Sequence, residues 1–395
     1  MMGVIIVGGG MVGSTLALAL AFLTRAQIPI RLIEAFVPDQ NASFSDDKRA
    51  IALAHGTCQQ LERLGIWKPL SHDATPITNI HVSDQGQCGF VHLRAQDHHI
   101  PFLGQVLSLK TAQNRLFSLL KSTPGIQLYC PAQVLQISRT QKMVRVTLNH
   151  GETLEAPLLI AADGSHSSLA QACHIQYQKK DYQQFAVTTH IRTEKALGSC
   201  AFERFTSEGP LALLPIFQEE SALVWCHSQA NRFLVEAWSD ADFLQQLQNT
   251  FGWRLGKILK VGPRYSTPLY LTFASRHISH RLALVGNSAQ TLHPVAGQGF
   301  NLGLRDTMTL AQILAEAAAK GDDLGEYSVL NQYQRQRQKD QQNMITLTEG
   351  LVHLFSNALK PLVVARHLGL MTMEEGPFFA QLLSRSTLGW SHPRD

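Results

Sequence analysis

Three glycines near the amino terminus have the spacing that binds a dinucleotide. Gly8, Gly10 and Gly13 form the pattern G-x-G-x-x-G, directly after the apolar run 3–7 and before the helix-forming segment 14–23. In this order the first glycine permits a tight turn, the second lets backbone approach a pyrophosphate, and the third lets helix and strand pack closely. The pyrophosphate then meets free amides at the positive end of the helix dipole.

A carboxylate follows at the place where an adenosine ribose needs one. Glu34 ends a second predicted strand, 28–33, about 20 residues beyond Gly13. A carboxylate there accepts hydrogen bonds from ribose hydroxyls and repels the 2′-phosphate of NADP. Strand, glycine pattern, helix, strand and carboxylate together predict a bound dinucleotide, but they leave NAD and FAD open.

A second glycine-rich segment, far along the chain, favours FAD. The apolar run 281–285 ends at Gly286, and a glycine-rich loop then leads into a long predicted helix. Another buried run, 158–162, ends at Asp163. A strand, a glycine-rich loop and a helix start form a second electropositive cradle. An NAD dehydrogenase has little need of a second cradle, whereas FAD is long enough to use both.

Composition excludes several other classes of protein. The chain has 395 residues, 45% hydrophobic and 16% charged, with a formal net charge of +4. These values indicate a globular protein of more than one lobe and argue against a disordered chain or a nucleic-acid binder. No cysteines form a CxxC pair and no ligand set surrounds the histidines, so we predict no metal. Isolated cysteines, and no signal peptide or spanning segment at the amino terminus, predict a cytoplasmic protein.

The order of these elements predicts an α/β fold. We expect a Rossmann-like FAD-binding domain with an inserted antiparallel-sheet substrate domain and carboxyl-terminal helices. Strand-like runs at 186–191, 201–205, 211–215 and 222–227 build the inserted sheet. The predicted boundaries are 1–74, 104–179 and 276–325 for the FAD-binding domain, 75–103 and 180–275 for the substrate domain, and 326–395 for the helical region. Within the last part, Gly321 is expected to end one helix, and another begins near Leu330.

The ordered motifs resemble those of a known family, the class A flavoprotein aromatic hydroxylases. The resemblance covers nearly the whole chain and includes the stretches 49–53, 201–205, 225–227, 290–306 and 368–371. Within that family the chain is most similar to the bacterial hydroxylases that act on 2-polyprenyl-6-methoxyphenol in ubiquinone biosynthesis. The resemblance implies FAD as cofactor, NAD(P)H or a partner protein as reductant, and O₂ and a prenylated phenol as substrates. The implied reaction is hydroxylation at C1 of the phenol through a flavin C4a-hydroperoxide.

The resemblance also assigns residues to the cofactor. It implies that Arg49 reaches the cofactor, that Gln105 lies near the flavin, and that Asn287 faces the ribityl chain. Backbone amides of 299–301 would face the pyrimidine edge of the flavin. The predicted cofactor-binding residues are Gly8, Gly10, Gly13, Glu34, Arg49, Gln105, Asp163, Gly286, Asn287, Gly299, Phe300 and Asn301.

Three positions depart from the family pattern. Asn287 replaces an aspartate, Gln290 replaces a histidine, and Ala170 replaces an arginine that supports nicotinamide docking. The last departure leaves the reductant open. It also suits an enzyme reduced within a multiprotein ubiquinone-biosynthesis complex.

Residues on the substrate side are predicted from their place beside the flavin motif. His293 and Pro294 are the predicted catalytic pair, with Pro294 at the junction of flavin and substrate. His293 would handle a proton or, alternatively, only hydrogen-bond within its loop. The predicted substrate-lining residues are Phe202, Phe205, Leu213 and Trp225. For each of these four, plain core packing is the alternative.

Further alternatives concern the carboxyl-terminal part and the activity. Arg335, Arg337 and Lys339 are interpreted as an exposed helix face, with a protein-docking or nucleic-acid surface as the alternative. The segment 351–371 is interpreted as packed helices, or as an interfacial surface that admits a prenyl tail, so at most peripheral membrane contact is expected. Two other functions stay open: a flavoprotein of the same fold acting on another aromatic or prenyl substrate, and a non-catalytic FAD-bound scaffold subunit.

Overall fold

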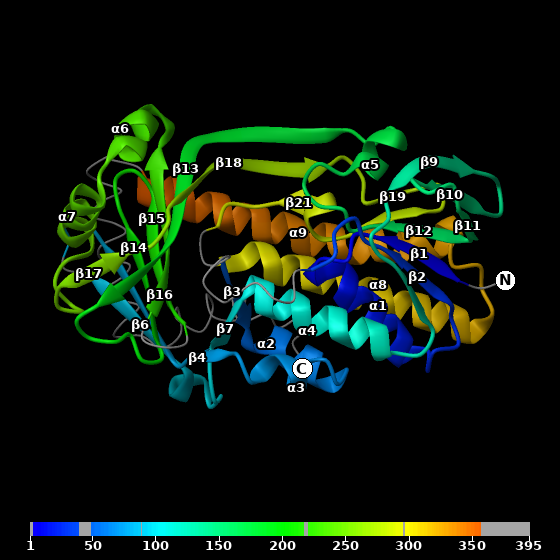
Figure 1. The fold of residues 1–395 in the computed structure, drawn as a ribbon, viewed down its shortest axis with the longest axis horizontal. Coiled ribbons are helices and arrows are strands. Elements are labelled where there is room, and N and C mark those ends of the chain that lie inside the picture. Colours follow the sequence, from blue (N-terminus) through cyan, green and yellow to red (C-terminus); the bar gives the residue numbers. More distant parts are fainter. Residues whose placement is uncertain (1–2, 39–48, 88, 217–219, 295–296, 357–395) are drawn as a thin grey trace.

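The first elements of the computed structural model, which describes residues 3–38, 49–87, 89–216, 220–294 and 297–356, follow the predicted order. β1 is Val4–Val7, α1 is Met11–Leu23 and β2 is Ile30–Ile33 (Figure 1). β1 pairs in parallel with β2 on one side and with β12 (Leu158–Ala161) on the other. The predicted parallel strands around the glycine pattern are therefore confirmed.

These strands belong to a six-stranded sheet that is covered on both faces. In spatial order its strands are β19 (Ile278–Ser279), β20 (Leu282–Leu284), β12, β1, β2 and β8 (Ile126–Tyr129). Among these described strands only β19 runs antiparallel. Val4 and Ile6 point to a core shared with α1, α4 (Leu109–Ser122) and α8 (Gln298–Lys320). Ile5 points to the other face. This alternation of buried side chains is the pattern of a sheet covered on both faces.

A small antiparallel sheet covers the second face. Its strands are β9 (Val134–Arg139), β10 (Val144–Leu148) and β11 (Thr153–Ala156). The side chains of Val144, Val146 and Leu154 pack with Ile5 and with the short helix α5 (Ser168–Ala172).

The predicted antiparallel sheet is present within a separate nine-stranded sheet, in which the pair Asn79–Asp84 and Cys200–Phe205 is parallel. Its strands, in spatial order, are β21 (Gln290–Thr291), β18 (Tyr265–Ala274), β13 (Tyr177–Thr193), β16 (Glu220–Ser228), β15 (Pro210–Pro215), β14 (Cys200–Phe205), β5 (Asn79–Asp84) and β6 (Phe90–Arg94), and β17 (Ile258–Val261) pairs with β13. On its outer face lie α6 (Arg232–Ala237) and α7 (Asp240–Phe251), drawn at the left of Figure 1. The two sheets place a cofactor region and an inserted antiparallel layer in one fold, as the sequence predicts.

A three-stranded sheet and short helices connect these two parts. β3 (Ala50–Ala54), β7 (Gly104–Ser108) and β4 (Thr75–Ile77) form the sheet, with β7 in the middle. β4 therefore pairs with β7 and not with the nine-stranded sheet, although the predicted boundary at residue 75 assigned it to the substrate side. The short helices are α2 (His55–Arg63), α3 (Trp67–Ser71), and the 3₁₀ turns Ala95–His98, Gln229–Asn231 and Gly286–Ser288.

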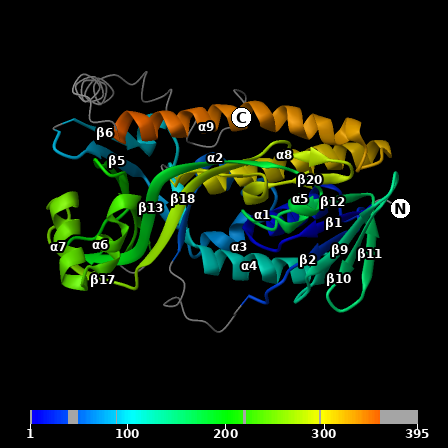
Figure 2. The ribbon, with the colours of Figure 1, turned by 90° about the horizontal axis from the view of Figure 1, so that it is seen from above.

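Two long helices end the described chain. α8 ends at Gly321, whose φ of +78° is the left-handed conformation predicted for this stop. α9 (Tyr327–Ser356) starts three residues before the predicted position. Figure 2 shows α9 alongside α8 and continuing over β13 and β18, where Lys180 pairs with Glu349.

One prediction about α9 is wrong. Arg335 and Lys339 are exposed, but the side chain of Arg337 is only 4% exposed and pairs with Asp306 of α8. The three basic residues therefore do not form one exposed face, because Arg337 points into the contact between the two helices.

Two statements bear on the membrane and on the carboxyl end. No helix within the described residues is long and apolar enough to cross a membrane. Residues 357–371 of the predicted interfacial segment 351–371, which include the stretch 368–371, lie outside the described residues. The predicted domain boundaries stay a prediction.

Candidate functional site

The glycine turn between β1 and α1 is shaped by close backbone contacts. A Cβ on Gly8, whose φ is +104°, would lie 2.3 Å from the carbonyl oxygen of Ala162. A Cβ on Gly13 would lie 1.9 Å from the carbonyl oxygen of Gly8. A Cβ on Gly10, in contrast, would meet no described atom within 4 Å outside its chain neighbours. Gly8 and Gly13 are thus required by the fold, whereas the space beside Gly10 is available to a ligand.

The start of α1 offers free amides to that space. Gly10 is the N-cap, with φ of −65° and ψ of −175°, and no described side chain caps the helix. The first turn of α1 contains no acidic residue. Unpaired amides at the positive end of a helix dipole form an anion site, and together with the open space at Gly10 they fit a pyrophosphate.

Glu34 lies directly beside this turn. Its Oε2 accepts a hydrogen bond from the Gly9 amide at 2.5 Å, and its Oε1 accepts one from the Phe36 amide at 2.9 Å. Each carboxylate oxygen keeps a further acceptor position. The two amides therefore orient the carboxylate at the end of β2, where a ribose would meet it.

The second predicted cradle contacts the first one. Gly286, with φ of +62°, would place a Cβ only 2.9 Å from the Val12 side chain. A Cβ on Gly303 of α8 would lie 3.2 Å from the same side chain. Residues nearly 300 positions apart in the chain thus meet at Val12, and the starts of α1 and α8 face one region. Asn287, next to Gly286, is exposed there.

The start of α8 is held against β3 by one amide side chain. Asn301 Oδ1 accepts hydrogen bonds from the Ala54 amide at 2.8 Å and from the Thr57 hydroxyl at 3.0 Å. Its Nδ2 donates to the carbonyl oxygens of Ala52 and Gly297, both at 3.0 Å. The side chain is therefore occupied, and only backbone remains for a ligand. Gly299, two residues earlier, would place a Cβ with no described neighbour within 4 Å.

Two further predicted residues carry buried polar atoms without a partner. Asp163 Oδ2 accepts from the Ser168 hydroxyl and the Leu169 amide at 3.4 Å, but its Oδ1 has no partner among the described residues. Burial raises the pKa of this carboxyl group. Gln105 Oε1 is likewise buried without a described partner. Such atoms need a ligand or water, which fits a bound cofactor in this region. Arg49 is exposed just before β3.

His293 is buried between the flavin motif and the nine-stranded sheet. Its side chain is 1% exposed, and its Nε2 lies 3.0 Å from Gln184 Oε1. The Tyr182 ring meets it edge-on, with ring centroids 5.0 Å apart. Burial lowers the pKa of His293 to about 4, so the imidazole is neutral at ordinary pH. Pro294 follows it, half-buried, at the last described position before the gap at 295–296.

The predicted substrate residues lie on two different faces of the nine-stranded sheet. Leu213 and Trp225 are buried in a core with Phe243 of α7, and Phe202 packs against that core. The structure therefore favours core packing for these three. Phe205 alternates with Phe202 along β14 and points to the opposite face.

That opposite face is directed at β3 and the start of α8. Ala201, Ala222 and Leu214 pack there with Ala52 of β3. Ala52 in turn lies 3.6 Å from the Cβ position of Gly297. Apolar side chains of the sheet thus pack through Ala52 toward the start of α8.

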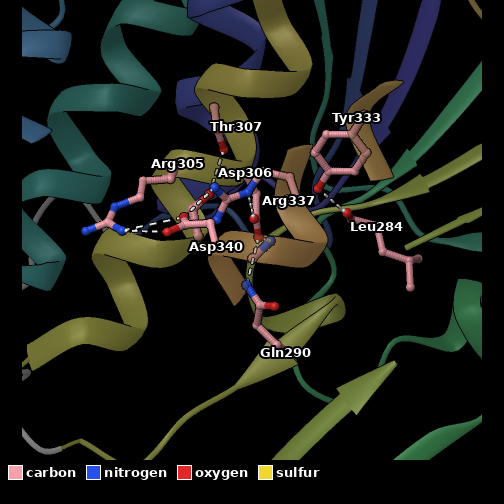
Figure 3. A network of polar contacts seen from close by, with 10 residues as sticks. Leu284, Gln290, Arg305, Asp306, Thr307, Tyr333, Arg337 and Asp340 are labelled. Carbon is pink, nitrogen blue, oxygen red and sulfur yellow. Dashed lines mark hydrogen bonds and ion pairs between the residues drawn. The ribbon is translucent and has the colours of Figure 1, made fainter. Parts of the chain in front are cut away.

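Sequence reasoning missed a buried ionic network next to the second cradle. Asp306 and Arg337 pair at 2.6 Å, and Arg337 also pairs with Asp340 at 2.6 Å (Figure 3). A signal was present in the sequence, because Leu330, Tyr333, Arg337 and Met344 share the helical spacing of an inward face. Arg337 occupies one of the positions on this inward face, and that position indicates that its charge is buried.

Comparison with known proteins gives results that cover the whole chain. A family model described as FAD binding domain matches residues 1–348. The chain is 34% identical to the ubiquinone hydroxylase UbiL of Rhodospirillum rubrum over 386 residues, which is 98% of this chain and 89% of that protein. It is 31% identical to the 3-demethoxyubiquinol 3-hydroxylase of Escherichia coli over 392 residues, 98% and 97% of the two chains.

A solved structure has the same fold. The crystal structure of p-nitrophenol 4-monooxygenase PnpA from Pseudomonas putida matches with a TM-score of 0.81 at 16% identity, and the match covers 100% of both chains. At this identity the similarity concerns the fold alone.

Proposed function

Because the chain belongs to the FAD binding domain family, we propose that it hydroxylates the ring of a polyprenylated phenol in ubiquinone biosynthesis. It is an FAD-dependent aromatic-ring monooxygenase, a flavoprotein oxidoreductase that uses O₂. Two relatives that match nearly its whole length are named as hydroxylases of ubiquinone or of its demethoxy precursor. These names support a role in ubiquinone biosynthesis. Which intermediate of that pathway is the substrate is itself proposed.

The observation that carries the proposal is the meeting of the two cradles at Val12. It brings the start of α1 together with Gly286 and Gly303, and we infer that FAD, which is long enough to use both cradles, binds across them. In this placement Gly10 and the first amides of α1 hold the pyrophosphate, and Glu34 holds the adenosine ribose. Asn287 faces the ribityl chain, with Arg49, Gln105 and Asp163 as further contacts.

The chain's own contribution to the reaction is position, polarity and exclusion of water. FAD, when bound and reduced, supplies an electrophilic oxygen derived from O₂. The backbone amides of Gly299, Phe300 and Asn301 would lie near the flavin and, as fixed dipoles, would stabilise negative charge on it. The apolar side chains of Ala201, Ala222 and Leu214 keep water away from the reacting centre.

His293 and Pro294 are proposed to border the reacting ring. His293 is neutral and hydrogen-bonded to Gln184, so it can orient a phenol or accept a hydrogen bond without carrying charge. Pro294 would form one wall at the junction of flavin and substrate, and Phe205 belongs to the face of the sheet that closes the site. These roles stay part of the proposal.

The proposed substrate is 2-polyprenyl-6-methoxyphenol, hydroxylated at C1. A prenylated phenol without a carboxylate suits the small apolar side chains on the inner face of the sheet. The electron donor is NAD(P)H or a partner protein. Ala170, at the place of the family arginine, has an uncharged side chain that is completely buried in a core. The position therefore offers no cation to a nicotinamide. A biosynthetic complex that supplies electrons agrees with this position.

Mass spectrometry of a strain that lacks the gene tests the function. We expect 2-polyprenyl-6-methoxyphenol to accumulate and ubiquinone to disappear. Accumulation of 3-demethoxyubiquinol would instead assign the ring position named for the Escherichia coli relative. Unchanged quinones would refute a role in this pathway.

Complementation of that strain separates an enzyme from a scaffold. The wild-type gene should restore ubiquinone, and the Gly10→Asp variant, which is expected to lose FAD, should not. Rescue by a variant shown to be free of flavin would support the non-catalytic scaffold.

A further inference from the structure

Asp306 is a fully buried carboxylate that supports the segment after β20. Its Oδ2 accepts hydrogen bonds from the Gly286 amide at 3.1 Å and from the Gln290 side-chain amide at 3.2 Å. Asn287 lies between these two anchored residues. The hydroxyl of Ser288 separately holds the middle of the segment, because it donates to the Ala161 carbonyl at 2.5 Å. The carboxylate therefore determines where both ends of segment 286–290 lie.

The charge that balances Asp306 comes from another helix. Arg337 of α9 donates from Nε to Asp306 Oδ1 and from Nη1 to Asp340, both at 2.6 Å. Asp340 also accepts from Arg305 of α8 at 3.2 Å, so two arginines face two carboxylates (Figure 3). Burial opposes the charge on Arg337, but the two carboxylates outweigh it and raise its pKa, so Arg337 stays charged.

A buried ion pair of this kind is sensitive to the loss of one member. Removing one charge leaves the other buried and uncompensated, which costs far more than loss of a surface pair. Asp306 has three acceptor contacts, and two of them hold segment 286–290. When Arg337 is lost, the carboxylate is expected to protonate or to move toward water, and either change disturbs that segment.

We propose that Asp306 and Arg337 form a positioning pair. Through this pair, the packing of α9 against α8 sets the affinity for FAD. The inference rests on the proposed placement of FAD beside Asn287. Arg337 does not touch the cofactor; it acts through Asp306 and the segment that Asp306 holds. Because such coupling is reciprocal, bound FAD must also stabilise the contact between α9 and α8.

The chain contains a matched control pair. Arg281, also buried, pairs through two hydrogen bonds of 3.0 and 2.6 Å with Asp323, between the start of β20 and the loop after α8. This pair joins the start of β20 to the loop between α8 and α9, its Asp323 is 39% exposed, and it makes no described contact with segment 286–290. Replacing Asp323 therefore removes the carboxylate partner of the buried Arg281. The hydrogen bonds from Gly286 and Gln290 to Asp306 are left intact.

The test measures FAD affinity and thermal stability in the same set of purified variants. We expect Arg337→Gln to weaken FAD binding at least tenfold in a fluorescence titration, whereas Asp323→Asn changes it less than twofold. Both variants should lower the thermal midpoint of the apoprotein. The double variant Asp306→Asn with Arg337→Gln should recover part of the affinity, because it removes both charges and keeps an acceptor for the Gly286 amide.

Hydrogen exchange on the wild-type holoprotein keeps the test independent of how well a variant folds. FAD should slow amide exchange in the stretch of α9 around Arg337. The proposal is overturned if FAD leaves that exchange unchanged, or if Arg337→Gln loses stability like Asp323→Asn yet keeps its FAD affinity. If Asn287→Ala also binds FAD normally, the proposed placement of the cofactor beside Asn287 is wrong. An unchanged affinity in Arg337→Gln would then count against that placement and not against the positioning pair.

Discussion

Replacing Gly10 separates the needs of the cofactor from those of the fold. Gly10 is the N-cap of α1, and a Cβ there meets no described atom within 4 Å. An aspartate at an N-cap accepts hydrogen bonds from the first amides and favours the helix over glycine by a few tenths of a kcal/mol. We therefore expect Gly10→Asp to leave the apoprotein as stable as the wild type, or slightly more stable.

The same change should nearly abolish FAD binding. A carboxylate about 5 Å from one phosphate charge costs about 3 kcal/mol at an effective dielectric constant of about 20. Filling the space that the pyrophosphate needs costs about 1–3 kcal/mol more. Each 1.4 kcal/mol is about tenfold in Kd, so the two effects, about 4–6 kcal/mol together, weaken binding by at least about a thousandfold. Gly10→Asn, which adds similar bulk without the charge, should lose only the smaller part.

Visible absorbance of the purified protein and a fluorescence titration of the apoprotein with FAD measure these affinities. Chemical denaturation of the apoproteins measures the free energy of unfolding in parallel. A Gly10→Asp protein that remains yellow at wild-type occupancy would refute the placement of the pyrophosphate. A large loss of apoprotein stability would instead show that the space beside Gly10 serves the fold.

Three other predictions follow from burial. Since burial lowers the pKa of His293 to about 4, only the unfolded state takes up a proton between pH 6.5 and 4. Stability should therefore fall by up to about 3 kcal/mol on acidification across this range, and His293→Gln should flatten that part of the pH–stability curve. Leu213→Ala, at a fully buried position under α7, should lower the free energy of unfolding by about 2–5 kcal/mol in urea. Ala222→Phe, on the inner face of the sheet, should raise KM for the prenylated phenol while FAD affinity stays unchanged; an unchanged KM would place the substrate elsewhere.

Local patterns predicted those parts of the fold where neighbouring residues determine the conformation. The turn at Gly8 and the stop at Gly321 both need a positive φ, and glycine adopts it without steric cost. Strands such as β1 and β12 consist of short apolar runs bounded by glycine or acidic residues, so their burial on both faces was readable. The two glycine-rich turns belong to this group, because each is built from contiguous residues.

Features that depend on contacts between distant segments were not predictable in the same way. Phe202, Leu213 and Trp225 lie on strands that were predicted correctly, but alternation alone does not say which face of a sheet meets the cofactor. The face became known only with the packing of α7 on one side and β3 on the other. Arg337 was assigned to the surface because a charged residue is usually exposed. Its buried partner, Asp306, lies 31 residues away on another helix.

The two long strands β13 and β18 have a consequence for making hybrid enzymes. β13 begins near Ser288, which its Tyr177 hydroxyl contacts at 2.6 Å, and continues through the sheet that carries the inner face. β18 returns antiparallel along it, from Tyr265 opposite Thr188 to Ala274 opposite Tyr177. Because one ladder, with a register shift between Asp181 and Gln184, joins the two parts, they form no pair of modules linked by a hinge. A chimaera that exchanges substrate preference should therefore take both strands, with β5 and β6, from one parent, whereas a junction in the middle of the ladder would combine mismatched registers.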